Sequence, residues 1–276
     1  MLTHRQQRVI DRFADVCLRD DRISAAFVGG SIAAATADEH SDLDLYALIR
    51  PRAYDQLLSQ HRRFVEQWAS PVFLEHFDGF GFDMLVFILQ DGIQGELGLA
   101  KPDRFLHIHG GPYAVLVDKQ KLLDGVQFPL QRPESEHQLR LLRTQMHWFW
   151  RDLSLWNVAI RRRQPWTAAG YLESMRRRCV RLVRLQSDFA SSAEDYEKLE
   201  QIVGQDQLAL IGASFSTLET EAMIEAVRNL VVCYQAVASQ LASRHGLEYP
   251  TSLQDTLLGE TAALLGRLER DPQSSA

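Results

Sequence analysis

The first fifth of the chain contains a short stretch whose residues could bind a phosphate group. Phe27-Val28-Gly29-Gly30-Ser31 leads an apolar run into two glycines and a serine. Glycine lets the backbone approach a ligand closely, and free backbone amides at the start of a helix favour an anion. Gly29, Gly30 and Ser31 are therefore candidates for holding phosphates, although a structural tight turn would give the same pattern.

Two aspartates follow at a spacing that could hold a metal ion. Asp42 and Asp44 alternate with apolar residues in Ser41-Asp42-Leu43-Asp44-Leu45-Tyr46, ten residues after Ser31. Residues two apart in a strand point to the same face, so the carboxylates converge and repel each other unless a cation or a proton joins them. Mg²⁺ prefers oxygen ligands and is often shared with substrate phosphates. A solvated strand end is the alternative, but the interleaved apolar residues and the upstream glycines favour a metal site.

Such a site needs a third carboxylate from a neighbouring strand, either as a ligand or as a proton acceptor. Asp83 lies early in one apolar run, and Glu96 follows the turn dipeptide Asp91-Gly92. Glu96 is the only acid in a strand otherwise made of apolar residues and glycine, which is an unusual place for a purely solvated charge. We therefore favour Glu96 as the third carboxylate and keep Asp83 as the alternative.

These residues must be positioned by short elements, because apolar runs broken by glycine, aspartate and proline make up the chain before residue 130. That texture is typical of α/β or α+β structure. We expect a hairpin around Asp91-Gly92 and a short helix for which Ser31 is the N-cap. The predicted strands cover residues 23–28, 43–49, 82–89, 96–99 and 113–117, and the predicted helices cover residues 4–20, 31–37 and 54–68.

After residue 130 the apolar residues recur at helical spacing with few helix breakers. Pro129 and Pro133 bracket this change of character, so we predict two domains, residues 1–130 and 131–276. The predicted helices of the second domain cover residues 135–163, 166–188, 194–202, 217–244 and 251–267.

Composition excludes several classes of protein. The 276 residues include 30 basic and 36 acidic side chains, a net charge of -6 that argues against a nucleic-acid partner. No apolar run approaches the ~20 residues that span a bilayer, and the N-terminus does not resemble a secretory leader. The three cysteines, Cys17, Cys179 and Cys233, lack metal-ligand spacing. We therefore expect reduced thiols in a cytoplasmic protein that has no membrane partner.

The Gly-Gly-Ser element followed by Asp-x-Asp on a strand resembles the DNA-polymerase-β-like nucleotidyltransferase superfamily, and within it the lincosamide nucleotidyltransferases and streptomycin adenylyltransferases. The turn and acid of residues 91–97 and the strand ending in Asp118-Lys119 are similar to theirs. The resemblance implies an α+β fold, with an N-terminal mixed β-sheet catalytic domain, a C-terminal helical bundle and an active site in the cleft between them. One departure is Ala33-Ala34-Ala35, which replaces a basic residue and a glycine common in the family and so removes a triphosphate contact.

The resemblance also implies a reaction, the Mg²⁺-dependent transfer of a nucleoside monophosphate from an NTP, with ATP as the expected donor. The acceptor would be a hydroxyl of a small molecule such as a lincosamide or aminoglycoside antibiotic, and pyrophosphate would leave. Asp42, Asp44 and Glu96 would bind the metal, and Glu96 would also accept the proton of the acceptor hydroxyl. Relatives in the superfamily suggest a homodimer.

Two other functions stay open. The chain could be a non-catalytic nucleotide-binding module of a regulatory or antitoxin-like kind, an interpretation that the Ala33-Ala34-Ala35 departure supports and the complete carboxylate set opposes. It could also nucleotidylate a protein target, which nothing in the sequence excludes.

The second domain offers side chains that each have two interpretations. The arginines of residues 161–163 and 176–178 could neutralise a triphosphate, but we favour solvated helix faces paired with nearby acids. Four tryptophans, at positions 148, 150, 156 and 166, could line an acceptor pocket or pack in a core. Tyr171 and Glu173 are candidate acceptor contacts, and we interpret His107 and His109 as strand-edge residues rather than zinc ligands.

Overall fold

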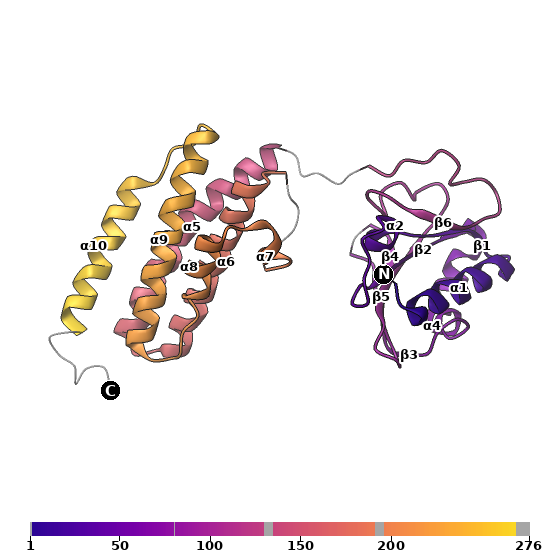
Figure 1. The fold of residues 1–276 in the computed structure, drawn as a ribbon, viewed down its shortest axis with the longest axis horizontal. Helices are drawn as coiled ribbons and strands as arrows, with labels where there is room; N and C mark the ends of the chain where they lie inside the picture. Colours follow the sequence, from indigo (N-terminus) through magenta and orange to yellow (C-terminus); the bar gives the residue numbers. More distant parts are fainter. Residues whose placement is uncertain (1, 80, 130–134, 191–195, 269–276) are drawn as a thin grey trace. The chain divides into compact units, whose positions relative to one another are not determined.

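The computed structural model describes residues 2–79, 81–129, 135–190 and 196–268. The chain divides into two compact units, Met1–Gln131 and Arg132–Ala276, and each is described by itself (Figure 1).

A six-stranded sheet forms the centre of the first unit, with the strand order β3-β4-β5-β2-β1-β6. Its strands are β1 (Ile23–Val28), β2 (Leu43–Ile49), β3 (Pro71–Phe77), β4 (Asp83–Leu89), β5 (Gln94–Ala100) and β6 (Ala114–Asp118). β2 and β5 run parallel, and every other neighbouring pair is antiparallel. This mixed sheet, followed by a helical unit, confirms the expected α+β fold class.

The two faces of the sheet differ because successive side chains of a strand point to opposite faces. Leu43, Leu45 and Ala47 of β2 are fully buried in a core that also includes residues from α1 (His4–Arg19), α3 (Tyr54–Ser59) and α4 (His61–Val65). Asp44 and Tyr46 are only partly buried and alternate with them. The opposite face therefore carries Asp44, the acidic residue of β2, while the helices cover the apolar face.

The β4–β5 hairpin confirms the turn predicted at Asp91-Gly92. Gly92 has a φ of 85°, a conformation that glycine adopts readily, and its N–H donates to the carbonyl of Leu89 over 2.9 Å. The register pairs Met84 with Gly98, which brings β5 beside β4 and places Glu96 in the interior of the sheet.

Three local predictions in the first unit were wrong. Strand β3 was missed because only Leu74 is buried in it, so it shows no alternation, and Pro71 is tolerated at the start of an edge strand. The helix predicted over residues 54–68 is divided at Gln60, whose backbone leaves the helical region. Ser31 is not an N-cap, since α2 (Gly30–Ala33) begins earlier and Gly29 occupies the cap position.

The second unit consists of helices packed around one apolar core. They are α5 (Ser135–Arg161), α6 (Pro165–Ser187), α7 (Leu199–Ile202), α8 (Gln205–Gly212), α9 (Thr220–Arg244) and α10 (Thr251–Leu268). Helix α8 was not predicted, and the helix predicted over residues 194–202 begins partly outside the described residues. No helix in the part of the chain that the structure describes is long and apolar enough to cross a membrane.

Candidate active site

The glycine turn after β1 is in direct contact with the second aspartate. Gly29 donates its N–H to the carbonyl of Asp44 over 2.9 Å, which ties the turn to β2. Gly30 has a φ of 56°, and a Cβ atom at this position would lie 1.7 Å from Oδ2 of Asp44. Glycine is therefore required at position 30 both by its backbone conformation and by the carboxylate beside it.

A buried histidine packs beneath the first glycine. A Cβ atom at Gly29 would lie 2.4 Å from Cε1 of His109, and the rings of His109 and Tyr46 lie 5.0 Å apart. The Nε2–H of His109 donates to the carbonyl of Pro112 over 2.9 Å, and burial lowers the pKa of this imidazole. His109 thus supports the turn as a neutral residue. Sequence reasoning placed it at a strand edge, because its contacts with the turn come from a distant part of the chain.

The Ser31 hydroxyl lies buried in the glycine turn. Its Oγ is buried and makes no hydrogen bond within the described residues. A buried polar group without a partner costs about 1–3 kcal/mol, and most such groups in folded proteins are satisfied. A ligand oxygen would satisfy this hydroxyl, as a phosphate held by Gly29, Gly30 and Ser31 would do.

The carboxylates of Asp44 and Glu96 share one face of the sheet. The parallel register pairs these two residues directly across β2 and β5. Burial raises the pKa of Asp44 to about 6, with further contributions from the charges of Asp42 and Glu96. Burial, followed by the charge of Asp42, also raises the pKa of Glu96. The three predicted carboxylates therefore repel one another electrostatically, and a bound cation would offset this repulsion.

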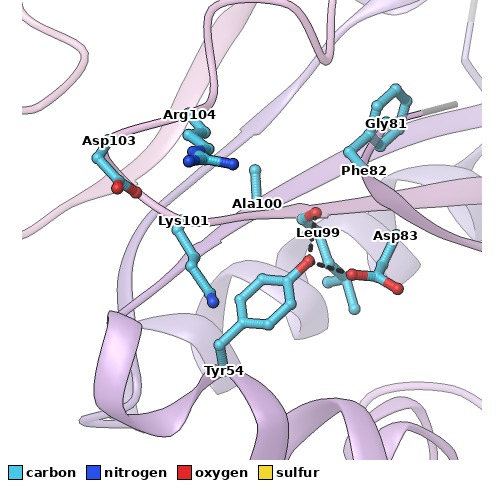
Figure 2. Close-up of a pocket in the computed structure, with 9 residues that line it drawn as sticks. All are labelled: Tyr54, Gly81, Phe82, Asp83, Leu99, Ala100, Lys101, Asp103 and Arg104. Carbon is cyan, nitrogen blue, oxygen red and sulfur yellow. Dashed lines mark hydrogen bonds between the residues drawn. The ribbon is translucent and has the colours of Figure 1, made fainter. Parts of the chain in front are cut away.

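Asp83, the alternative third carboxylate, lies on the other face. It is the register partner of Leu99, and Leu99 points away from the face of Glu96 because the two are three positions apart in β5. Oδ2 of Asp83 lies 2.5 Å from the Tyr54 hydroxyl, which is also 3.0 Å from the carbonyl of Leu99 (Figure 2). Oδ1 lies 2.6 Å from Nε2 of His76. The structure brings Glu96 beside Asp44 and keeps Asp83 away from it.

The Asp83 side chain lines a separate pocket of about 430 Å³, whose other polar walls come from Lys101, Asp103 and Arg104 (Figure 2). Neither Asp42, Asp44 nor Glu96 lines this pocket.

The donor chemistry of the carboxylate face fits Mg²⁺. Within the residues that the structure describes, no three His, Cys, Asp or Glu side chains form a closed metal-binding group. Mg²⁺ does not require one, since it usually takes one or two carboxylates and completes its octahedron with water and substrate phosphates. Asp42 and Asp44 would provide the carboxylate oxygens, and a cation would offset the burial and the repulsion that together raise the pKa of Asp44.

In the second unit most of the singled-out side chains serve packing or pairing. Trp150 and Trp156 are fully buried, whereas Trp148 is 45% exposed and Trp166 is 78% exposed. Glu173 accepts hydrogen bonds from Arg176, from Nε of Arg177 over 3.0 Å and from the Tyr196 hydroxyl over 3.1 Å.

Arg178 is similarly engaged, because its Nε donates to Oδ2 of Asp152 over 2.6 Å. We favour pairing with nearby acids for this basic cluster. The structure confirms such pairing at Arg176, Arg177 and Arg178.

Comparisons with known proteins bear on the whole chain. No curated protein sequence matches it significantly. Among solved structures, an aminoglycoside 6-adenyltransferase from Bacillus subtilis is 14% identical, with a TM-score of 0.46, over 94% of this chain and 98% of that one. Two structures of Cid1 are more distant. The poly(U) polymerase with Mg 3'-dATP bound is 14% identical with a TM-score of 0.30, over 81% of this chain and 66% of that one. The complex with the UTP analogue UMPNPP is 13% identical with a TM-score of 0.29, over 82% of this chain and 67% of that one.

At these TM-scores the structural likenesses carry no argument, so the assignment depends on a family match. The family model for streptomycin adenylyltransferase matches residues 3–258, which include most of both units. This match confirms the resemblance found in the sequence. The chain belongs to the streptomycin adenylyltransferase family and is an adenylyltransferase.

Proposed function

We propose that the chain transfers a nucleoside monophosphate from an NTP, with ATP as the expected donor, to a hydroxyl of a small antibiotic-type acceptor and releases pyrophosphate. The observation that carries this proposal is the contact between Gly30 and Asp44, together with the pairing of Asp44 and Glu96. The turn is suited to phosphates, and the carboxylates are suited to Mg²⁺. The two meet at one point of the sheet, as a metal-bound triphosphate requires.

Each residue of this face has a role that its surroundings support. Ser31 and the amides around Gly30 bind phosphate oxygens, and Asp42 and Asp44 hold Mg²⁺. When bound, Mg²⁺ would neutralise phosphate charge and stabilise the charge that develops on the transferring phosphoryl group. Glu96 accepts the proton of the acceptor hydroxyl and orients that hydroxyl toward the α-phosphorus. Burial, followed by the charge of Asp42, raises the pKa of Glu96, which makes it a stronger proton acceptor.

The acceptor class follows from the family and from charge. An aminoglycoside or a lincosamide is the acceptor we propose, and the net charge of -6 favours a cationic molecule. We place the reaction in the cytoplasm, since Cys17, Cys179 and Cys233 are all free and buried.

A second candidate is a nucleotide-binding regulatory module without catalysis, and the departure at Ala33-Ala34-Ala35 favours it. Ala35 has a φ of 57°, in the left-handed region that favours glycine. The loop thus keeps a glycine-like conformation without a basic side chain to contact a triphosphate. Such a module would bind nucleotide without turning it over.

The deciding experiment is Mg²⁺-dependent pyrophosphate release from each NTP, against a panel of aminoglycosides and lincosamides. Asp44→Asn serves as the inactive control. Pyrophosphate release by the wild type with one acceptor, and no release by Asp44→Asn, would support the proposal and name the substrate class. Nucleotide binding without release for any acceptor would favour the regulatory module, and the absence of nucleotide binding would contradict both.

A further inference from the structure

Among the described residues, no strand pairing of the sheet includes Asp42. Asp42 precedes the first residue of β2, and the ladder between β2 and β5 begins only at Leu43 and Gly95. The Asp42 side chain is also exposed. Some other contact must therefore fix this residue if its carboxylate is to meet a metal ion together with Asp44.

That contact comes from Gln6, a buried side chain in the first turn of α1. Gln6 is 2% exposed, and its Nε2 donates to the carbonyl of Asp38 over 3.2 Å and to the carbonyl of Ser41 over 2.7 Å. The Ser41 carbonyl belongs to the peptide bond that leads into Asp42. Holding this carbonyl fixes the peptide plane from which Asp42 extends.

The turn that Gln6 holds is also closed by its own hydrogen bonds. Ser41 Oγ accepts from the Asp38 N–H over 2.9 Å and donates to Asp38 Oδ1 over 3.1 Å. Asp38 Oδ1 also accepts from the His40 N–H over 2.9 Å. These side-chain hydrogen bonds close the turn, and Gln6 holds the closed turn against α1.

The chemistry of the contact requires glutamine rather than glutamate. Gln6 completes a capping box with Thr3, in which its Oε1 accepts from the Thr3 N–H over 2.8 Å. Glutamate would serve that box equally well. Both partners on the other side are carbonyls, which only accept hydrogen bonds, so the amide nitrogen is needed there. The same chemistry fixes which end of the amide is which.

We propose that Gln6 is a positioning residue for the metal site, which holds the Asp38–Ser41 turn so that Asp42 meets the cation together with Asp44. This inference rests on the proposed metal-dependent function. Outer contacts that orient a ligand typically change metal affinity by about 10–100-fold when they are removed.

Two variants break this contact in different ways. Gln6→Glu keeps the acceptor for Thr3 and places an oxygen against the two carbonyls, whereas Gln6→Met is neutral and removes both halves of the contact. Two controls isolate the effect. Thr3→Val removes the capping hydroxyl, which accepts from the Gln6 N–H and donates to Gln6 Oε1, but it keeps the amide nitrogen that bonds the two carbonyls. Gln7→Glu adds the same charge at an exposed neighbour whose Nε2 bonds only Asp11 among the contacts of the described residues.

Two measurements test the proposal on the full chain, and neither depends on turnover. The first is the affinity for Mn²⁺ alone, followed by electron paramagnetic resonance of the free ion. The second is amide hydrogen exchange of residues 38–44 in the metal-free protein. We expect about tenfold weaker Mn²⁺ binding and at least tenfold faster exchange in both Gln6 variants. Thr3→Val and Gln7→Glu should match the wild type within twofold.

The outcomes separate this inference from the proposed function. Wild-type Mn²⁺ affinity in a folded Gln6→Glu or Gln6→Met protein would overturn it, whether or not the turn exchanges faster. A wild-type chain that binds no Mn²⁺ would instead contradict the metal-dependent function itself, and the positioning role would fall with it.

Discussion

Oδ2 of Asp44 occupies the space in which a side chain at Gly30 would have to begin, 1.7 Å from an added Cβ atom. The turn proposed to bind phosphate and the strand proposed to bind the metal are thus in contact in the ligand-free protein. A change in either residue must move the other, so the two elements behave as one unit of the site.

The first prediction concerns that contact. Gly30→Ala should lower transfer by at least about 100-fold, because an alanine at a φ of 56° displaces the Asp44 carboxylate, and a misplacement near 1 Å costs that much. It should also destabilise the first unit by about 1–3 kcal/mol through the left-handed backbone and the clash. Gly79→Ala is the matched control, since an added Cβ there meets nothing within 4 Å. Equal activity of the two variants, at equal protein concentration, would contradict the contact.

The second prediction separates stability from activity at Asp44. The folded pKa of about 6 lies above the ordinary value of 3.8, so the folded protein binds this proton more tightly than the unfolded chain does. The metal-free wild type should therefore lose stability as pH rises from about 4 to about 6, and Asp44→Asn should not. At pH 8 the variant should be more stable by about 1–2 kcal/mol, since one pKa unit is about 1.4 kcal/mol and Asp44 is partly exposed.

Thermal unfolding in the presence of a chelator, at pH 4 and pH 8, measures this difference. Transfer by Asp44→Asn should be undetectable at either pH. A variant that unfolds earlier than the wild type at pH 8 would show that Asp44 is stabilised by its surroundings rather than strained by them.

The third prediction tests the choice between Glu96 and Asp83. Glu96→Gln should lower kcat by about 100–10,000-fold with little change in nucleotide affinity, as expected for a lost proton acceptor. Asp83→Asn should keep wild-type kcat, since Asp83 faces the opposite side of the sheet and contacts Tyr54 and His76. The Asp83→Asn substitution should instead lower the thermal stability of the protein. The reverse pattern of kcat values would transfer the role of Glu96 to Asp83.

The sequence predicted the elements of the site better than it predicted their support. Local properties, namely spacing in a strand and the lack of a side chain, were enough to predict Asp42, Asp44 and the two glycines. Glu96 could be ranked above Asp83 from its apolar surroundings and chiefly from the family resemblance of residues 91–97, but only the β2–β5 register shows that it faces Asp44. Strand register depends on the pairing of distant segments, which a single sequence does not encode visibly.

The supporting residues were missed for a related reason. Gln6 reads as an ordinary helix residue, and its bonds to Asp38 and Ser41 join segments more than 30 residues apart. His109 lies in a segment without helix or strand, so no periodicity indicates that it packs beneath Gly29. Strand β3 escaped because a mostly exposed edge strand lacks the apolar alternation by which strands are found.

The last prediction concerns Ser31 and uses a second buried serine as its control. The Oγ atoms of Ser31 and Ser24 are both buried without a partner among the described residues, so replacing either by alanine removes an unsatisfied group. Each alanine variant should therefore be as stable as the wild type, or more stable by about 1 kcal/mol. Nucleotide affinity should separate them.

Ser31→Ala should bind Mg-ATP about tenfold more weakly, the effect of one lost hydrogen bond to a charged phosphate, which is worth about 1.5 kcal/mol or more. Ser24→Ala should bind it normally, because Ser24 lies in β1 well before the glycine turn. Isothermal titration with a non-hydrolysable ATP analogue measures both affinities. Equal affinities would mean that the free hydroxyl of Ser31 is a packing feature of α2 and that phosphate contacts come from the backbone amides alone.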